Sequence, residues 1–249
     1  MEETEKERLG GPPPKPLLVD VVTVFPGMLG RFLDESIVAR ARNAGKAEIR
    51  LVDLRDFSRD QRRTVDDKPY SGGPGMLMKP DVWYDAIENC LALARARGVK
   101  SSRVVMTTPA GTPYSQAVAR SFAASEHLVV VCGHYEGVDD RVSRLVTDAI
   151  SMGDFVLTGG EIPAAAIVDS TVRLLPGVLG GGAAATSCES FGDGGLLEAP
   201  QYTRPASFRG MEVPPELVGG DHAKADAWRR HMAYDLTSRN RPDLLEVRR

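Results

Sequence analysis

Short apolar runs alternate with amphipathic segments through most of the chain. The apolar runs predict buried strands at residues 17–25, 47–54, 103–107 and 127–132, and a further strand within 149–157. Apolar positions at helical spacing predict helices at residues 26–42, 80–97, 114–124, 138–146 and 161–175. Strands that alternate with helices in this way predict an α/β domain with a largely parallel sheet.

The last of these helices carries its own start signal. Thr158-Gly-Gly-Glu161 has the spacing of a capping box, in which the first and fourth residues satisfy the free backbone amides of a helix. Pro163 suits the first turn that follows. We therefore expect the helix to begin close to Glu161.

Segments without periodicity predict how the chain divides. Residues 1–16 are acidic and then rich in proline, which predicts a disordered tail before a domain at residues 17–177. Residues 176–200 contain seven glycines, which predicts a flexible linker at 178–200. Residues 201–249 are interrupted by prolines and then helical around 224–237, so we expect a small helical domain there.

Composition excludes several classes of protein. The hydrophobic share of 42% and the charged share of 26% are ordinary for a globular domain. The sequence has no apolar run long enough for a membrane span and no signal-peptide pattern near its start, so we expect a cytoplasmic protein. The three cysteines form no CxxC pair, which argues against a zinc site or a disulfide framework and fits a reducing compartment.

The charge distribution says more than the net charge of −3. Residues 222–249 hold seven Lys and Arg against four Asp and Glu, and residues 40–63 hold eight against four. Local basic patches can bind a polyanion, because phosphate attraction is screened over short distances. On charge alone, a solvated surface explains these segments equally well.

Glycine-bearing segments follow three of the predicted strands, at Thr108–Gly111, Gly133–Gly137 and Thr158–Glu161. The two common nucleotide fingerprints, GxGxxG after a strand and GxxxxGK[ST], do not occur. Ligands of open α/β sheets bind beyond the carboxyl ends of the strands, and glycine permits close approach of a ligand to the backbone. The three segments therefore predict one shared site, with ordinary tight turns as the alternative.

Six longer motifs, in order along the chain, carry a resemblance to a known family. They are Arg63–Met78, Val131–Arg141 (VCGHYEGVDDR), Met152–Glu161, Pro176–Gly180, Tyr202–Pro205 and Gly210–Pro215. Through them the chain closely resembles the bacterial tRNA (guanine-N1)-methyltransferases of the TrmD type, which belong to the SPOUT class. The resemblance implies a deep trefoil knot in the α/β domain and a homodimer with its active site at the subunit interface. It also implies transfer of a methyl group from S-adenosylmethionine to N1 of the guanosine at tRNA position 37, when another guanosine precedes it.

The resemblance places S-adenosylmethionine in the loops of the knot. The implied cofactor-binding residues are Thr107, Thr108, Pro109, Gly111, Gly133, Tyr135, Glu136, Met152, Gly153, Phe155, Leu157, Gly159 and Gly160. Backbone groups at strand ends can bind the edge of adenine and the ribose hydroxyls, while Pro109 and Leu157 can sandwich the base. For Leu157 taken alone, the residue type favours packing in the core. A dependence on Mg²⁺ is implied only weakly, and no metal-binding pattern accompanies it.

Methylation of N1 requires a base for its proton and a donor for the charge that develops on O6. The resemblance implies an acidic residue before Ser-Phe as the base, which is Glu189 here although aspartate is expected. The segment that follows is one glycine longer than expected, so Asp193 is a second candidate. The implied O6 donor is Arg173, since a planar guanidinium suits that role.

The resemblance and the basic segments together predict where tRNA binds. We expect contacts from the long polar loop predicted at residues 55–75, from the segment before the C-terminal helix and from that helix: Arg59, Arg62, Arg63, Gly73, Gly75, Arg204, Lys224, Arg229 and Arg230. The glycines would let an extruded base approach the backbone. Two alternatives stay open, a catalytically inactive tRNA-binding scaffold and a knotted RNA methyltransferase with another base specificity.

Overall fold

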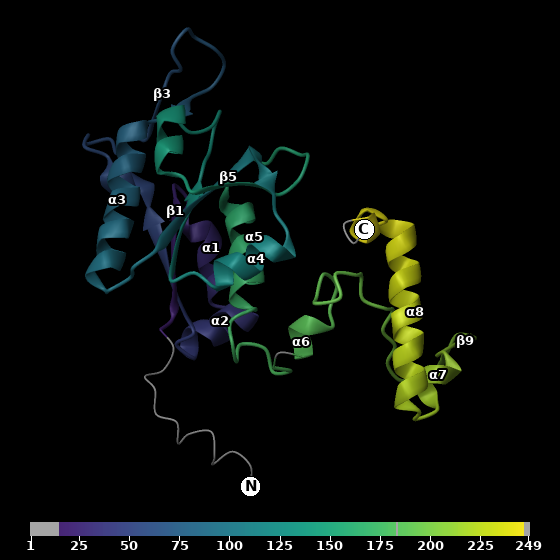
Figure 1. Ribbon diagram of the computed structural model, residues 1–249. Coiled ribbons are helices and arrows are strands. Elements are labelled where there is room, and N and C mark those ends of the chain that lie inside the picture. The colour runs from purple at the N-terminus through teal and green to yellow at the C-terminus, as the bar shows by residue number, and fades with distance from the viewer. Residues whose placement is uncertain (1–14, 183, 247–249) are drawn as a thin grey trace, which may run out of the picture. The chain divides into compact units, whose positions relative to one another are not determined.

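The computed structural model describes residues 15–182 and 184–246. The chain divides into two compact units, Met1–Leu179 and Gly180–Arg249 (Figure 1). Within the described residues, no helix is both long enough and apolar enough to cross a membrane.

The first unit is built on a five-stranded sheet in the order β2-β1-β6-β5-β7, with every pairing parallel. The strands are β1 (Leu17–Thr23), β2 (Ala47–Asp53), β5 (Ser102–Pro113), β6 (His127–Cys132) and β7 (Asp148–Ser151). Every residue of β1 and β6 is buried, as continuous apolar runs between helical layers require. The prediction of an α/β domain with a largely parallel sheet is therefore confirmed.

Helices cover both faces of this sheet (Figure 1). One face packs against α1 (Pro26–Leu33), α2 (Ser36–Asn43), α4 (Gln116–Ala123) and α5 (Glu161–Val172). The other packs against α3 (Pro80–Ala96) and the 3₁₀ segments η2 (Leu54–Phe57) and η3 (Asp140–Leu145). Alternate residues of β1 serve the two layers, with Val21 on the first side and Val22 on the second. The core is therefore two apolar layers that share one sheet.

Several predicted boundaries were wrong. The helix predicted at 26–42 is two helices, because the chain breaks at Asp34–Glu35 and Ser36 adopts a φ of 53°. The helix predicted at 138–146 is the 3₁₀ segment η3. The long loop predicted at 55–75 contains part of η2 and the strand β3 (Asp66–Asp67), which pairs with β4 (Leu77–Met78).

Strand β5 is longer than predicted. It continues past Thr107 through the segment predicted as a loop, and its pairing with β7 shifts register between Thr107 and Thr112. A Cβ at Gly111 would collide with the backbone of Ile150, so only glycine fits this close pairing.

The predicted capping box does not form. Gly160 is the N-cap of α5 and provides no side-chain cap, and Thr158 lies before it. The Glu161 carboxylate instead accepts a hydrogen bond from Thr23 Oγ1, 2.5 Å away on β1. Glu161 therefore binds Thr23, which is distant in the sequence, and does not bind the backbone of Thr158.

The second unit contains short elements and one long helix. They are α6 (Ala184–Ser187), the hairpin β8 (Ser207–Phe208) and β9 (Met211–Glu212), α7 (Pro215–Val218), α8 (His222–Asn240) and α9 (Asp243–Glu246). Asp221 caps α8 by accepting from the amides of Ala223 and Lys224. Thr237 Oγ1 accepts from Leu197 N at 2.9 Å, which ties the preceding segment to α8.

A buried charged cluster joins neighbouring strands of the first unit, away from the carboxyl edge of the sheet. Arg50 on β2 donates two hydrogen bonds of 2.6 Å to Asp20 on β1, and His127 Nε2 lies 3.1 Å from Asp20 Oδ2. His127 Nδ1 lies 2.9 Å from Ser102 Oγ on β5. Burial raises the pKa of Asp20, but hydrogen bonds from His127 and Arg50 outweigh it and hold the pKa below its usual value.

We expect Asp20→Asn to lower the free energy of unfolding by about 1.5–3 kcal/mol near neutral pH, because it removes the charge from a buried carboxylate that accepts hydrogen bonds from Arg50. The folded-state pKa of Asp20 lies below that of the unfolded chain. The stabilisation by the carboxylate is therefore present above the unfolded-state pKa and is lost as pH falls through the folded-state pKa. The difference in the free energy of unfolding between wild type and Asp20→Asn should shrink below about pH 4. Urea unfolding at neutral and at acidic pH measures this difference.

The matched control is Asp34→Asn, which removes an exposed ion pair with Arg42. We expect that change to cost at most about 1 kcal/mol. If the difference for Asp20→Asn stayed constant on acidification, its carboxylate charge would not be the source of stability.

Candidate active site

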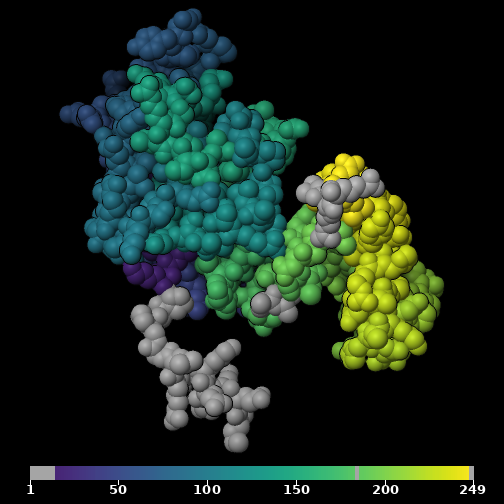
Figure 2. All heavy atoms as spheres, viewed as in Figure 1, coloured from purple at the N-terminus to yellow at the C-terminus, as the bar shows by residue number. Residues whose placement is uncertain are grey.

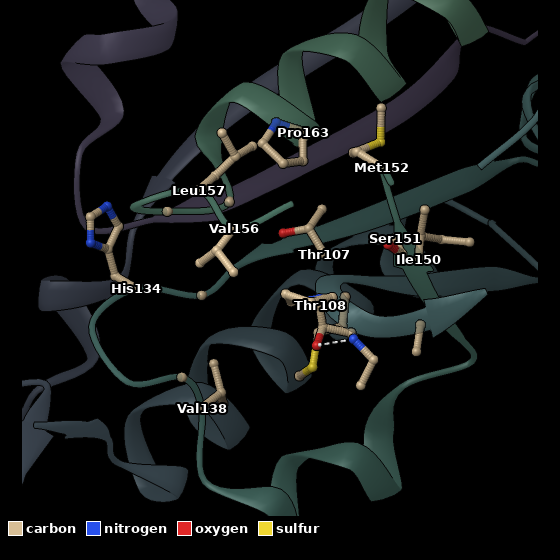
Figure 3. Close-up of a pocket in the computed structure, with 18 of the residues that line it drawn as sticks. Thr107, Thr108, His134, Val138, Ile150, Ser151, Met152, Val156, Leu157 and Pro163 are labelled. Atoms are coloured by element: carbon tan, nitrogen blue, oxygen red, sulfur yellow. Dashed lines mark hydrogen bonds between the residues drawn. The ribbon is translucent and has the colours of Figure 1, made fainter. Parts of the chain in front are cut away.

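A cavity of about 580 Å³ opens at the carboxyl ends of β5, β6 and β7, in the size range of small-molecule sites. All three glycine-bearing segments line it. Every predicted cofactor-binding residue except Gly111 belongs to its lining. In the view of Figure 3, His134 and Leu157 lie across the cavity from Ile150, Ser151 and Met152, with Thr107 and Thr108 between them.

The cavity wall holds its shape through close backbone contacts. Gly160 N donates to Gly133 O at 2.9 Å, which joins the loop after β6 to the start of α5. A Cβ at Gly160 would collide with Thr107 Oγ1 and lie 2.6 Å from Cys132 Cα. Thr107 Oγ1 in turn donates to Val131 O at 3.2 Å. The strand ends therefore present backbone to the cavity in a fixed arrangement.

A polar pair with a buried carboxylate includes one residue of this wall, His134. His134 Nε2 lies 3.3 Å from Glu161 Oε2, and the Glu161 side chain is almost completely buried. Thr23 binds the other carboxylate oxygen. A Cβ at Gly159 would collide with both His134 and Glu161. Sequence reasoning missed this pair, because the capping-box spacing offered a local explanation for Glu161.

We expect His134→Ala and Glu161→Gln to be non-additive, because each variant leaves the other side chain without its partner. Their effects on the free energy of unfolding should differ from additivity by about 0.5–3 kcal/mol. Thermal or urea unfolding of both single variants and the double variant measures the difference. His134→Ala combined with Ser102→Ala should be additive, since Ser102 belongs to the separate Asp20 cluster.

Apolar side chains form the rim of the cavity. Phe155 is 56% exposed, Val156 85% and Leu157 38%. The exposure of Leu157 excludes the explanation that it packs in the core. The sequence-based prediction named Phe155 and Leu157 but not Val156, although Val156 lies between them in the motif Met152–Glu161.

The predicted catalytic residues belong to different compact units. Arg173 is the C-cap of α5, so it lies at the opposite end of that helix from the cavity wall. Twelve helical residues separate these ends by roughly 18 Å, at 1.5 Å per residue. Glu189 and Asp193 lie in a turn of the second unit, where Gly192 N donates to Glu189 O at 2.8 Å.

Several predicted tRNA-binding cations form ion pairs in the structure. Arg59 lies 2.7 Å from Asp85, Arg63 pairs with Asp53 and Asp56, Lys224 with Asp221, and Arg229 with Asp226. Arg62, Arg204 and Arg230 are exposed. Exposed ion pairs are weak, so these cations can exchange a carboxylate for a phosphate.

The two loop glycines differ in their surroundings. Gly73 has a φ of 138°, and a Cβ there would meet only Pro69 at 3.7 Å. A Cβ at Gly75 would collide with the side chain of Glu136, which lines the cavity.

Within residues 15–182 and 184–246, no group of three or more His, Cys, Asp or Glu side chains could hold a metal ion.

Comparison with known proteins identifies the family. The family profile described as "tRNA (Guanine-1)-methyltransferase TrmD" matches residues 17–247. The chain belongs to this family. A relative from Moorella thermoacetica is 50% identical over 230 residues, which cover 91% of this chain and 89% of the relative. Relatives from Geobacillus kaustophilus and an Exiguobacterium species are 48% and 49% identical, over 92% of this chain and 91% and 92% of their own lengths. All three carry the name tRNA (guanine-N(1)-)-methyltransferase.

Proposed function

We propose that this TrmD-family protein is a cytoplasmic enzyme that methylates N1 of guanosine 37 in tRNA, with S-adenosylmethionine as methyl donor. The observation that carries the proposal is a family match over almost the whole chain, combined with a ligand-sized cavity lined by the matched motifs. The names of the relatives favour methyl transfer over the inactive scaffold, and guanine N1 over another base position.

The cavity suits S-adenosylmethionine on physical grounds. Its walls combine strand-end backbone with apolar side chains of Pro109, Phe155 and Leu157, which match the polar edges and the flat faces of adenine. The close packing of Gly159 and Gly160 leaves backbone rather than side chains facing the ligand. When bound, the cofactor supplies an electrophilic methyl group on a sulfonium.

The remaining chemistry falls to side chains of this protein. The carboxylate of Glu189 would accept the N1 proton and so leave a lone pair on N1 for the methyl group that a bound cofactor would supply. The guanidinium of Arg173 donates hydrogen bonds to O6 as negative charge develops there. The Glu189 carboxylate reaches one methylene further than the aspartate expected at this position.

The position of Arg173 supports a homodimer with shared active sites. Because it lies at the far end of α5 from the cavity of its own protomer, we propose that it acts at the cavity of the second copy. The exposed apolar rim at residues 155–157 offers a surface that such a copy would cover. Family membership further supports a trefoil knot in the α/β domain and a tRNA-binding role for residues 201–249.

Methyl transfer to two tRNA transcripts tests the proposal. One transcript has guanosine at positions 36 and 37, and the other has position 37 replaced. Labelled methyl groups should reach only the first transcript, and calorimetry should show binding of S-adenosylhomocysteine. Equal labelling of both transcripts would overturn the assignment to position 37, and binding of tRNA without any labelling would overturn the enzyme.

A further inference from the structure

We propose that Tyr70, in the loop at residues 68–76, is a stacking platform for a nucleobase next to the methylated guanosine. The inference rests on the proposed function, because it takes tRNA as the substrate. Tyr70 is not among the predicted tRNA contacts, and its proposed partner is a nucleobase rather than a phosphate.

The loop grows directly out of the cavity wall. Glu136 N donates to Met76 O at 3.0 Å, Met78 N to Gly137 O at 2.9 Å and Asp139 N to Met78 O at 3.0 Å. These bonds fasten β4 to residues 136–139, which line the cavity. Gly75 packs so closely on Glu136 that no side chain fits between them. The foot of the loop, at Gly75 and Met76, therefore lies at the cavity wall.

The loop projects from the unit and presents Tyr70 to solvent. Figure 1 shows the blue segment between β3 and β4 extending beyond the helical layers, and Figure 2 shows it as a protrusion. Tyr70 is 94% exposed, more than any other large hydrophobic side chain in the described part of the chain. Ser71, Gly72, Gly73 and Gly75 all have positive φ, between 67° and 138°. This backbone turns the chain tightly and leaves both faces of the ring open.

The surrounding charges favour a base over the phosphate backbone. Asp66 and Asp67 precede the loop, and Asp139 and Asp140 lie beyond its anchor. Arg141 donates two hydrogen bonds of 2.8 Å to Asp139. Four carboxylates offset Lys68 and Arg141, so this surface offers a phosphate little net attraction, whereas an exposed aromatic ring stacks on any base.

Tyr70→Ala should weaken binding of the guanosine-36, guanosine-37 transcript by about 5- to 150-fold, the usual loss for one base stacked on an aromatic ring. Tyr70→Phe should bind within about twofold of wild type, because the ring is kept. The slope of log affinity against log salt should not change, since no phosphate contact is lost. Calorimetry with S-adenosylhomocysteine should give wild-type affinity for both variants. Leu93→Ala is the matched control, an exposed apolar residue at 43% that lines a small hollow elsewhere in the unit.

Transcripts that lack the base at position 36 or 38 locate the contact. With one of these transcripts, Tyr70→Ala and wild type should bind equally well, because the base that would stack on the Tyr70 ring is already absent. A Tyr70→Ala protein that binds tRNA as wild type does, a penalty that persists with both abasic transcripts, or a change in oligomeric state would each overturn the inference. Failure of wild type to methylate any transcript would instead overturn the proposed function on which it rests.

Discussion

Glu189→Gln should lower kcat for guanosine methylation by about 10²- to 10⁴-fold, the usual contribution of a general base. Glutamine is nearly isosteric with glutamate but cannot accept the N1 proton at neutral pH. Because the amide preserves shape, the KM for tRNA and the affinity for S-adenosylhomocysteine should change little. Steady-state methyl transfer, with the two substrates varied in turn, separates these parameters.

Asp193→Asn is the matched control, since Asp193 lies in the same turn and carries the same charge. We expect it to retain most of the activity. If Asp193→Asn lost activity and Glu189→Gln did not, the longer glycine segment would have moved the base to Asp193. If both variants stayed active, the proton would leave to a group outside this turn. Glu189→Asp should keep substantial activity, because it restores a carboxylate at shorter reach.

Arg173→Ala should lower kcat by about 10²- to 10³-fold, comparable to the loss of one donor to a developing oxyanion. Thr108→Trp should abolish activity by preventing cofactor binding, because an indole at this position of the cavity lining would occupy the space of the cofactor. Mixing the two inactive proteins after dissociation and reassociation should restore activity. In a mixed dimer, the intact cavity of the Arg173→Ala protomer receives Arg173 from the Thr108→Trp protomer.

The restored signal separates two arrangements of the active site. If Arg173 served the cavity of its own protomer, every site in the mixed dimer would lack one component and no activity would return. Circular dichroism and S-adenosylhomocysteine binding should show that Arg173→Ala remains folded with a working cavity. Each variant reassociated with itself gives the background.

Physical chemistry explains why the sheet could be predicted and two of the helices could not. Continuous apolar runs such as those of β1 and β6 must be buried on both faces, whatever packs against them. A helix boundary depends on a few local dihedral angles instead. The break at Asp34–Glu35 has no proline or glycine to announce it, and η3 winds more tightly than an α-helix with the same apolar pattern.

In the candidate site, too, some features could be predicted from the sequence and others could not. The glycine-bearing segments could be assigned to one place because parallel strands end at one edge of a sheet. Which side chains meet there depended on contacts across the fold. Glu161 and Thr23 are separated by 138 residues, and His134 reaches Glu161 from a third element. No periodicity or short motif encodes such a pairing.

The sequence by itself determined the α/β class, the parallel strands, the family and the segments that line the cavity. These follow from local hydrophobic periodicity and from contiguous motifs, which are properties of neighbouring residues. Only the tertiary structure decided that Glu161 binds Thr23 rather than capping its helix, that Asp20 and His127 form a buried cluster, and that the Tyr70 loop is anchored at Glu136. Buried polar groups take whichever partner the fold brings within hydrogen-bond distance, because leaving them unpaired costs several kcal/mol. That partner can lie anywhere in the chain.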